Sequence, residues 1–304
     1  MTTNIRSCRH EGEDLFDIYL DEELCTQCGL CEDDCVRGVF RQEADGRMVV
    51  TNEEQCILCG HCVAICPTGA ITHGTLGQDG FEEITSEMDV DPRRLRDLLR
   101  RRRSMRAYLE RPVPRAVTEE LIEMARWAPT GSNSQKVEFT VIEDRDTLQK
   151  LDDGTMAIQA ETWRRVSDPE SIKRRTARVG VEAVQQLLLR LAPLEQMVKR
   201  YHQGESVALW GAPALLLAHT ASAEYFGRDD CLFATYNFML GCNARGLGTC
   251  LIGLVVLALP SSEALTRLVD LPAGQTVHAA CVFGYPRYHH QRLVPRNPIP
   301  TRWL

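Results

Sequence analysis

The sequence predicts an α+β fold, with helices layered on a sheet, preceded by a small cysteine-rich domain. Eight of the thirteen cysteines lie between Cys25 and Cys66, in two copies of one spacing. From about residue 88 onward, short apolar runs typical of strands alternate with segments of helical periodicity. This alternation alone is compatible with an α+β or an α/β body built around one layered sheet.

Charge divides the chain at the same place. Residues 1–80 contain fifteen Asp or Glu and five Arg but no Lys, so their net charge is −10. The whole chain carries −7, which leaves +3 for the remainder. A composition shift of this kind marks a domain boundary, and we expect domains at residues 1–82 and 83–304. The acidic head would repel a phosphate backbone, so nucleic acid is not an expected partner.

Membrane insertion and secretion are also not expected. The longest apolar run, from Cys250 to Leu259, is ten residues long and too short to cross a bilayer. The first fifteen residues contain no apolar signal region. We therefore expect a cytoplasmic protein with no membrane partner, in which a disulfide scaffold is disfavoured.

The two cysteine clusters, CTQCGLCEDDC and CILCGHCVAICP, share the spacing Cys-x2-Cys-x2-Cys-x3-Cys. Short loops let the three closely spaced thiolates converge on one cubane cluster. Zinc is disfavoured because it usually takes two Cys-x2-Cys pairs and has no use for a third equally spaced cysteine. The head resembles a bacterial-type ferredoxin with two [4Fe-4S] clusters, in which the fourth cysteine of each run ligates the other cluster. The resemblance implies two ligand sets: Cys25, Cys28, Cys31 and Cys66 for cluster I, and Cys56, Cys59, Cys62 and Cys35 for cluster II.

The rest of the head offers few further ligands. Met48–Val50 and residues 70–72 are expected to form small β-ribbons, and residues 74–80 the exit from the domain. His61 and His73 are expected to be solvent-facing or loop residues, since no ligand is missing for either to supply. Cys8 is expected to be a free thiol in the N-terminal arm.

The body opens with an arginine-rich helix. Asp91 is its expected N-cap and Pro92 its first residue. Leu95, Leu98 and Leu99 form the inner stripe. Position 102 continues that stripe, so Arg102 is directed inward unless the helix has already ended. A buried guanidinium requires an anion, because leaving it unpaired costs several kcal/mol.

The remaining elements are expected in alternation, and no dinucleotide or Walker-type glycine motif is present that would indicate a separate Rossmann domain. The first three are a helix capped by Thr118 and ended by Pro129, a polar loop to Gln135 and a strand over 137–144. A helical stretch over 176–202 follows, which Pro193 is expected to break or kink. The last four are a buried strand within 210–220, a helix over 228–245, a buried strand over 276–284 and an extended tail.

Several motifs in this order resemble those of the FMN-dependent nitroreductase family. They are RRSMR at residues 102–106, then RPVP, EELIEMARWAP and PTGSNSQ, and further on GAPALLLA, GLGTCLIG and GYPRYHHQRLVPR. The resemblance covers about residues 92–297, apart from a poorly matching stretch near 152–205. It implies the α+β nitroreductase-type sheet. Together with the head, the chain resembles the ferredoxin-fused nitroreductases of anaerobic microbes.

The resemblance also implies a flavin site. Guanidinium forks suit phosphate oxygens by charge and geometry, and the family holds the FMN phosphate with arginines from both ends of the domain. The implied phosphate contacts are Arg102, Ser104 and Arg106, with Arg292 and Arg296 from the tail. Arg103 is implied at the flavin ring edge. Ser132, Asn133 and Gln135 are implied at the ribityl chain or ring edge, and the backbone N–H groups of Leu247, Gly248 and Thr249 at N5 or the phosphate side.

The expected function is that of an oxidoreductase, in which electrons pass from the two [4Fe-4S] clusters through FMN to a small organic acceptor. Nitroaromatics, quinones and activated alkenes are the acceptor candidates, and an external ferredoxin or NAD(P)H is the candidate donor. No catalytic side chain is assigned, because the flavin does the redox chemistry. The resemblance implies a homodimer. The alternative is a non-catalytic electron carrier or redox sensor.

Overall fold

The structure, a computed structural model, describes residues 17–304, so the expectation for Cys8 lies outside the described residues. The described chain divides into two units. The first comprises residues 17–90 together with Thr130–Gln135, and the second Asp91–Pro129 together with Lys136–Leu304. The division after Val90 coincides with the N-cap of the arginine-rich helix.

The first unit is built from two similar halves. Strand β1 pairs antiparallel with β4, and β2 with β3. The halves repeat at positions 31 residues apart, as Cys25 and Cys56 are. Gln27 and Leu58, one residue before the second cysteine of each run, both have positive φ, at 58° and 55°. The elements of this unit are β1 (Ile18–Leu20), α1 (Leu30–Asp34), β2 (Phe40–Gln42), β3 (Met48–Val50), η1 (Glu53–Gln55), α2 (His61–Ile65), β4 (Ile71–His73), η2 (Ser86–Met88) and the loop turn η3 (Gly131–Asn133).

The second unit contains a four-stranded antiparallel sheet in the order β5-β6-β8-β7. Its elements are α3 (Pro92–Arg101), α4 (Arg115–Ala125), β5 (Glu138–Ile142), α5 (Arg145–Ser167), α6 (Pro169–Val179), α7 (Val181–His202), β6 (Ala214–Ala221), α8 (Gly227–Ala244), β7 (Gly248–Leu251), α9 (Gly253–Ala258), η4 (Leu259–Ser261), α10 (Glu263–Leu268) and β8 (Gln275–Gly284).

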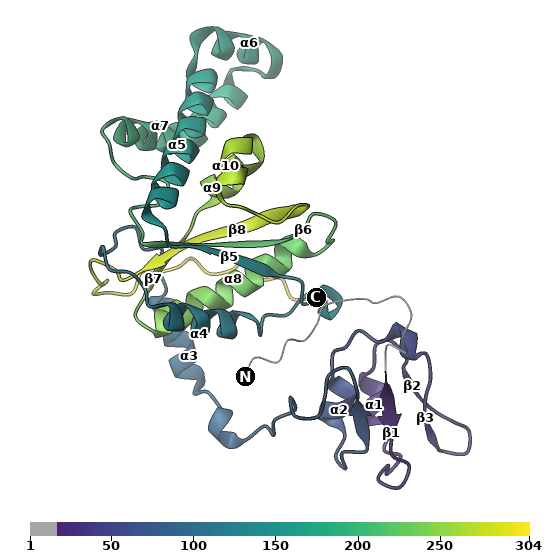
Figure 1. The fold of residues 1–304 in the computed structure, drawn as a ribbon. Helices are drawn as coiled ribbons and strands as arrows, with labels where there is room; N and C mark the ends of the chain where they lie inside the picture. The colour runs from purple at the N-terminus through teal and green to yellow at the C-terminus, as the bar shows by residue number, and fades with distance from the viewer. Residues whose placement is uncertain (1–16) are drawn as a thin grey trace. The chain divides into compact units, whose positions relative to one another are not determined.

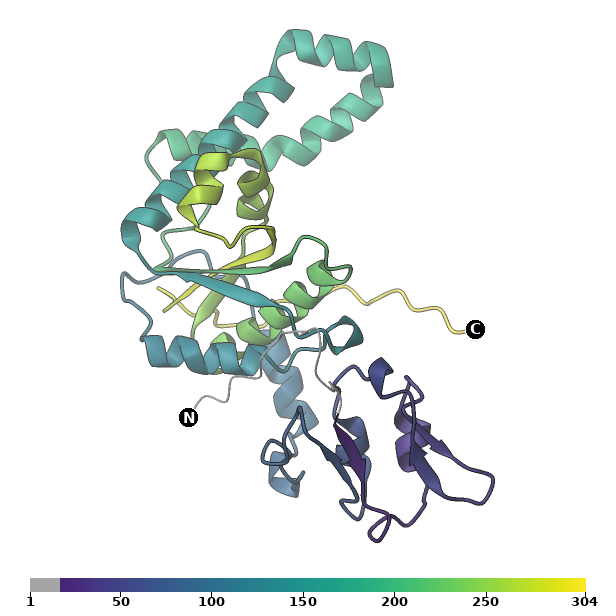
Figure 2. The same ribbon diagram turned by 45° about the vertical axis from the view of Figure 1, so that its right-hand side comes forward.

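Helices cover both faces of this sheet (Figures 1 and 2). Strand β6 is buried on both faces, which explains its continuous apolar run. Leu215 and Leu217 pack on the side of α5, α9 and α10, whereas Leu216 and Ala218 pack on the side of α4 and α8, against Phe238. The period-two alternation of a strand therefore divides this one run between two hydrophobic cores.

The helical stretch near residues 169–202 differs from its expected form. The helices α6 and α7 are separated at Gly180, whose φ is +87°, a conformation that glycine adopts without a Cβ penalty. Pro193 lies inside α7, which continues through it, so of the two expected effects of Pro193, a break or a kink, the break was wrong. Helices α5, α6 and α7 extend away from the sheet (Figures 1 and 2).

The helix α4 begins earlier than expected. Its N-cap is Pro114 and its first residue Arg115, so Thr118 lies inside the helix rather than capping it. Thr118 is buried at 4% exposure. An ion pair between Arg115 and Glu119, one turn apart, joins side chains of the first turns.

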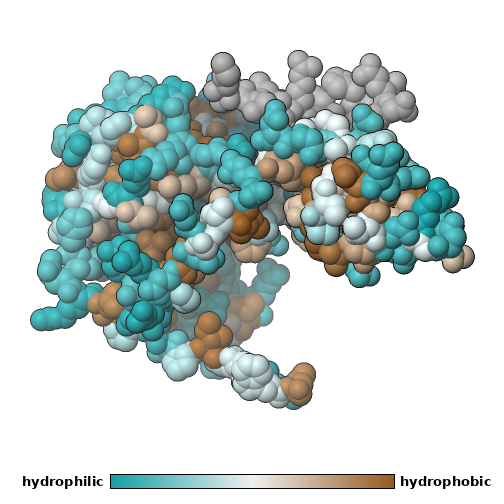
Figure 3. Space-filling view, turned by 90° about the horizontal axis from the view of Figure 1, so that it is seen from below, coloured by the Kyte–Doolittle hydropathy of each residue, from teal (hydrophilic) through white to brown (hydrophobic). Residues whose placement is uncertain are grey.

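The surface drawn in Figure 3 is largely hydrophilic, with hydrophobic patches scattered among the polar side chains. Within residues 17–304, none of the helices combines the length and the apolar character needed to cross a bilayer.

Candidate functional site

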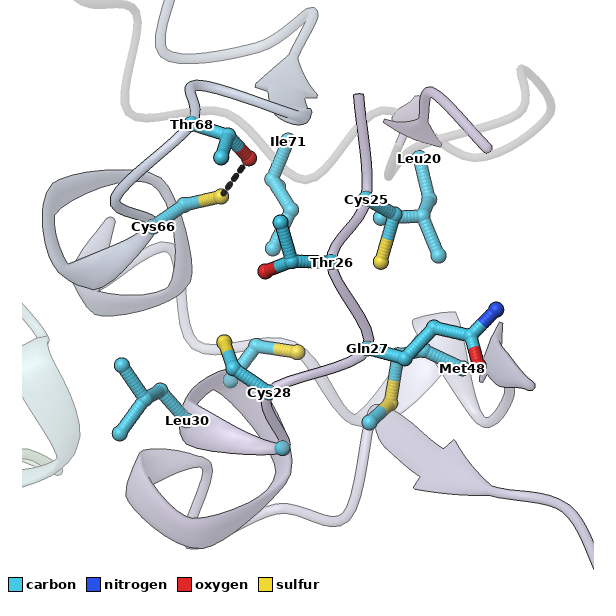
Figure 4. A pocket seen from close by; sticks show the side chains of 12 residues that line it. Leu20, Cys25, Thr26, Gln27, Cys28, Leu30, Met48, Cys66, Thr68 and Ile71 are labelled. Carbon is cyan, nitrogen blue, oxygen red and sulfur yellow. Dashed lines mark hydrogen bonds between the residues drawn. The ribbon is translucent and has the colours of Figure 1, made fainter. Parts of the chain in front are cut away.

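The first unit contains a hollow lined by four thiols, together with the apolar side chains of Leu20, Met48 and Ile71. The sulfurs of the cysteines labelled in Figure 4 face a common space. The four cysteines are the ones expected to bind cluster I: Cys25, Cys28, Cys31 and Cys66. The first three come from one loop and the start of α1, and the fourth from the end of α2.

A second hollow repeats this arrangement. Its lining includes the apolar residues Ile18, Val39 and Phe40 and the imidazole of His73. Its four cysteines are the ones expected to bind cluster II: Cys35, Cys56, Cys59 and Cys62. Each hollow thus takes three thiols from one run and one from the other, which is the crossed pattern that the ferredoxin resemblance implies.

Backbone N–H groups point at the sulfurs in both halves. Ala70 N–H donates to Cys66 Sγ at 3.3 Å, and Val39 N–H donates to Cys35 Sγ at 3.5 Å. The Thr68 hydroxyl lies 3.7 Å from Cys66 Sγ (Figure 4). Such donors stabilise negative charge on a sulfur ligand and therefore bear on the potential of a bound cluster.

The histidines of this unit have different environments. His61 is exposed at the start of α2, 3.3 Å from Asp34, as expected for a solvent-facing residue. His73 is only 1% exposed and its Nε2 lies 3.6 Å from Cys56 Sγ. The expectation of a solvent-facing or loop position for His73 was wrong, because this residue closes β4 against β1, opposite Ile18.

The polar loop Thr130–Gln135 groups with the first unit through its hydrogen bonds. The Asn133 side-chain amide donates to the carbonyl oxygens of Ile57 at 3.1 Å and Leu58 at 2.8 Å. Arg37 Nη2 donates to Ser132 Oγ at 3.5 Å. Asn133 therefore holds the loop that joins the first two cysteines of the second run, and Gln135 is exposed beside it.

The second unit places cationic side chains where α3 ends. The helix ends at Arg101, and Arg102 follows as its C-cap with N–H donating to Leu98 O. Arg102 is half-buried, and its Nε is buried without a hydrogen-bond partner within the described residues. A guanidinium nitrogen is seldom left in this state without an anion nearby. The environment of Arg102 thus suits an anion, as the phosphate role implied by the family resemblance requires.

The segment after α3 runs along the edge of the sheet. Met105 N–H donates to Thr249 O at 2.8 Å, and Ser104 forms a parallel bridge with Thr249 of β7. A Cβ at Gly248 would lie 2.7 Å from the Met105 side chain, so this position requires glycine. The expected site residues at 102–106 and 247–249 are thereby brought together, although they are far apart in the sequence.

Cys250 lies beneath this edge. Burial raises the pKa of the Cys250 thiol, whereas Arg106 and the hydroxyl of Ser104 act in the opposite direction. The thiol is 3% exposed and belongs to the hydrophobic core. Ser104 and Arg106 therefore converge on one buried, uncharged sulfur while remaining exposed on their outer sides.

Two features of this region carry no signal in the sequence. Two guanidinium groups lie over the Trp210 ring, with Arg106 Cζ 5.7 Å and Arg200 Cζ 5.6 Å from its centroid. Asp152 is 3% exposed, and its Oδ1 accepts hydrogen bonds from the backbone of Ala208 and Leu209, next to Trp210. A buried carboxylate thus holds the loop that presents the tryptophan to Arg106.

A protein-family model described as the nitroreductase family matches residues 99–285. The chain belongs to the nitroreductase family. A second family model, described as a 4Fe-4S dicluster domain, matches residues 24–71 of the same chain. The mixed helix and strand content of the second unit agrees with the α+β nitroreductase fold expected from the sequence.

Solved nitroreductases share this fold. A Bacteroides fragilis nitroreductase with bound FMN is 18% identical, with a TM-score of 0.51 over 69% of this chain and 96% of its own. An FMN-dependent nitroreductase of Clostridium difficile is 16% identical, with a TM-score of 0.50 over 70% of this chain and 100% of its own.

A curated Stenotrophomonas maltophilia relative, provisionally named as an NADH dehydrogenase/NAD(P)H nitroreductase, is 31% identical over 62 residues. That match spans 20% of this chain and 32% of the relative. The chain therefore spans about a third of the length of the curated relatives that it matches.

The remaining expected site residues of this nitroreductase have different environments. Arg292 and Arg296 are exposed on the extended tail. Ser132, Asn133 and Gln135 belong to the first unit. Arg103 is half-buried next to Arg102. The flavin roles of all these residues stay predictions.

Proposed function

We propose that this nitroreductase is an FMN-dependent oxidoreductase that passes electrons from two [4Fe-4S] clusters to a small organic acceptor such as a nitroaromatic, a quinone or an activated alkene. The proposal rests on one observation above all, which is that a chain of this family also carries two separate four-thiol hollows. FMN supplies the conversion between one-electron carriers and two-electron organic acceptors.

The thiols fit the clusters in number and in environment. Burial raises the pKa of Cys31 to about 11 and that of Cys62 to about 12. These thiols would therefore bind as thiolates only when iron displaces their protons. Cys28 and Cys59 are exposed at the rims, so each hollow also has one ligand close to solvent.

The residues Arg102, Ser104 and Arg106 beside β7, which we call the arginine edge, fit the FMN phosphate. Arg102 would donate its buried Nε or its terminal nitrogens, Ser104 its hydroxyl and Arg106 a second guanidinium. The phosphate carries a charge of roughly −2, which these groups would neutralise. The backbone N–H groups of Leu247–Thr249 are proposed to contribute further donors at N5 or the phosphate side. The FMN-bound Bacteroides fragilis protein, which shares the fold, supports this choice of cofactor.

The expected partners follow from this proposal. An external ferredoxin is the proposed donor, with NAD(P)H as the second candidate, and a second copy of the chain is the proposed oligomeric partner. Arg292 and Arg296 are proposed to complete the phosphate site from the tail.

The experiment is a composition and single-turnover assay on anaerobically purified protein. We expect about eight iron atoms and about one FMN per chain. Protein reduced with a known amount of dithionite should then transfer electron pairs to a nitroaromatic or a quinone. Retention of every electron by the reduced protein would indicate a non-catalytic carrier or sensor instead, and the lack of bound flavin would contradict the proposal.

A further inference from the structure

The duplicated halves of the first unit differ at the last residue of one strand. His73 ends β4, and the corresponding position 31 residues earlier, at the end of β2, is Gln42. Gln42 is exposed, and its amide donates to the carbonyl oxygens of Gln27 and Gly46. His73 is buried and lies against Cys56. The second half therefore has a ring nitrogen at a ligand sulfur where the first half has none.

The backbone holds His73 in this position. Gly74 N–H donates to Asp17 O at 2.7 Å, which closes the end of the β1–β4 pair. A Cβ at Gly74 would lie 2.9 Å from Asp17, so the chain after His73 packs tightly. The imidazole consequently lines the second hollow rather than turning to solvent.

The surroundings of the His73 ring decide which ring nitrogen donates to Cys56. Nε2 lies 3.6 Å from Cys56 Sγ, and a ligand thiolate can only accept a hydrogen bond. The other ring nitrogen, Nδ1, is buried and has no hydrogen-bond partner within the described residues. A proton on Nδ1 alone would leave a buried donor unpaired and would set the lone pair of Nε2 against the lone pairs of the Cys56 sulfur. A proton on Nε2 instead donates a hydrogen bond to that sulfur.

We propose that His73 donates an Nε2–H···Sγ hydrogen bond to Cys56 and thereby raises the reduction potential of cluster II. This inference rests on the proposed clusters. One-electron reduction adds negative charge that is shared by the sulfur ligands, and a donor at a ligand sulfur stabilises that charge. The imidazole acts through Cys56, so His73 is a positioning and tuning residue rather than a ligand.

The test is a redox titration of the holoprotein followed by electron paramagnetic resonance. His73→Phe keeps a ring but removes the donor, and should lower one of the two midpoint potentials. At a fixed potential, the ratio of reduced to oxidised cluster should fall by about tenfold, which is the effect expected from the loss of one hydrogen bond. A tenfold change in this ratio corresponds to a shift of about 59 mV in the midpoint potential of a one-electron couple. His73→Gln places an amide nitrogen near the former Nε2 and should restore part of the loss. Gln42→Ala is the matched control and should leave both midpoints unchanged.

A measurement on the unaltered protein keeps the proposal testable if a variant fails to load iron. When the protein is labelled with ¹⁵N-histidine and reduced, pulsed electron paramagnetic resonance should detect a histidine nitrogen coupled to one cluster. Unchanged midpoints in His73→Phe, or the absence of this coupling, would overturn the proposal. Failure of the proposed function is distinguishable, because a protein without clusters would give no cluster signal in any variant.

Discussion

The arginine run before Ser104 contains residues with different environments. Arg100 is exposed and lies 3.5 Å from Asp97, one turn earlier on α3, and Arg101 is exposed at the last helical position, where positive charge is favourable. Arg102 is the first of the run to be half-buried, with an unpartnered Nε. The expected inner stripe of this helix was wrong, because Leu95 and Leu99 are 46% and 41% exposed and Leu98 is only half-buried. The helix ends one residue before Arg102, so the burial of Arg102 does not follow from that stripe.

We expect Arg102→Ala to weaken FMN binding by about ten- to hundredfold, because hydrogen bonds to charged groups contribute about 1.5–3 kcal/mol. Iron content should be unchanged, since Arg102 belongs to the second unit. Fluorescence titration of the flavin-free protein measures the affinity, and Arg101→Ala is the neighbouring control. Equal affinity in the wild type and Arg102→Ala would exclude the phosphate role of this residue.

Among the elements, the helices α5 to α7 lie in the part of the sequence that matches the family poorly and predicts little chemistry. The buried carboxyl group of Asp152, in the first half of α5, connects that helix to the backbone of Ala208 and Leu209. Its role could not be predicted, because the two hydrogen bonds join residues more than fifty positions apart. A charged residue in a helix is usually solvent-exposed, so the sequence alone favoured the wrong environment.

Asp152 should make stability depend on pH. Burial raises the pKa of Asp152 above its ordinary value of 3.8, although the Ser206 side chain and the two backbone N–H donors act in the opposite direction. Because the folded-state pKa is the higher one, its contribution to stability is present below pH 3.8 and is lost as the pH rises through the folded-state value. Asp152→Asn keeps an acceptor oxygen and loses the charge. Its free energy of unfolding, relative to wild type, should therefore increase as the pH rises toward neutrality.

Urea denaturation followed by tryptophan fluorescence at several pH values measures this difference. Asp152→Ala is the companion variant. It leaves two buried N–H groups without their acceptor and should be destabilised by about 2 kcal/mol or more at every pH. A pH-independent difference between Asp152→Asn and wild type would show that the carboxyl does not titrate differently in the folded protein.

The loop Thr130–Gln135 supports the second cysteine run. Removing the two hydrogen bonds of the Asn133 amide should loosen the loop at Ile57 and Leu58. We expect about half of the iron in Asn133→Ala, that of cluster II, to be lost to a chelator roughly fivefold faster than in wild type, which corresponds to about 1 kcal/mol for the net loss of these hydrogen bonds. Gln135→Ala, at an exposed position of the same loop, is the control. One uniform release rate in both variants would show that Asn133 does not support the cluster II loop.

At the scale of the whole molecule, the parts that could be predicted are those governed by local sequence. The cysteine spacing places three thiols on one short loop in each half, and apolar runs such as that of β6 identify buried strands. The parts that could not be predicted depend on distant residues. The burial of His73 requires β1, and the position of Asn133 requires a loop about 75 residues away. The sequence does differ at the equivalent positions Gln42 and His73 of the repeat, but that difference alone does not say which of the two side chains is buried.

Electrons that enter at the iron–sulfur head are proposed to reach the bound flavin. Anaerobic stopped-flow absorption of the holoprotein mixed with reduced ferredoxin tests this proposal most directly, with NADH and NADPH in parallel. We expect the cluster absorbance to bleach first and the flavin band to follow, and a nitroaromatic or a quinone to restore both. Clusters that bleach while the flavin stays oxidised, or a flavin band that none of the three donors bleaches, would contradict the proposal.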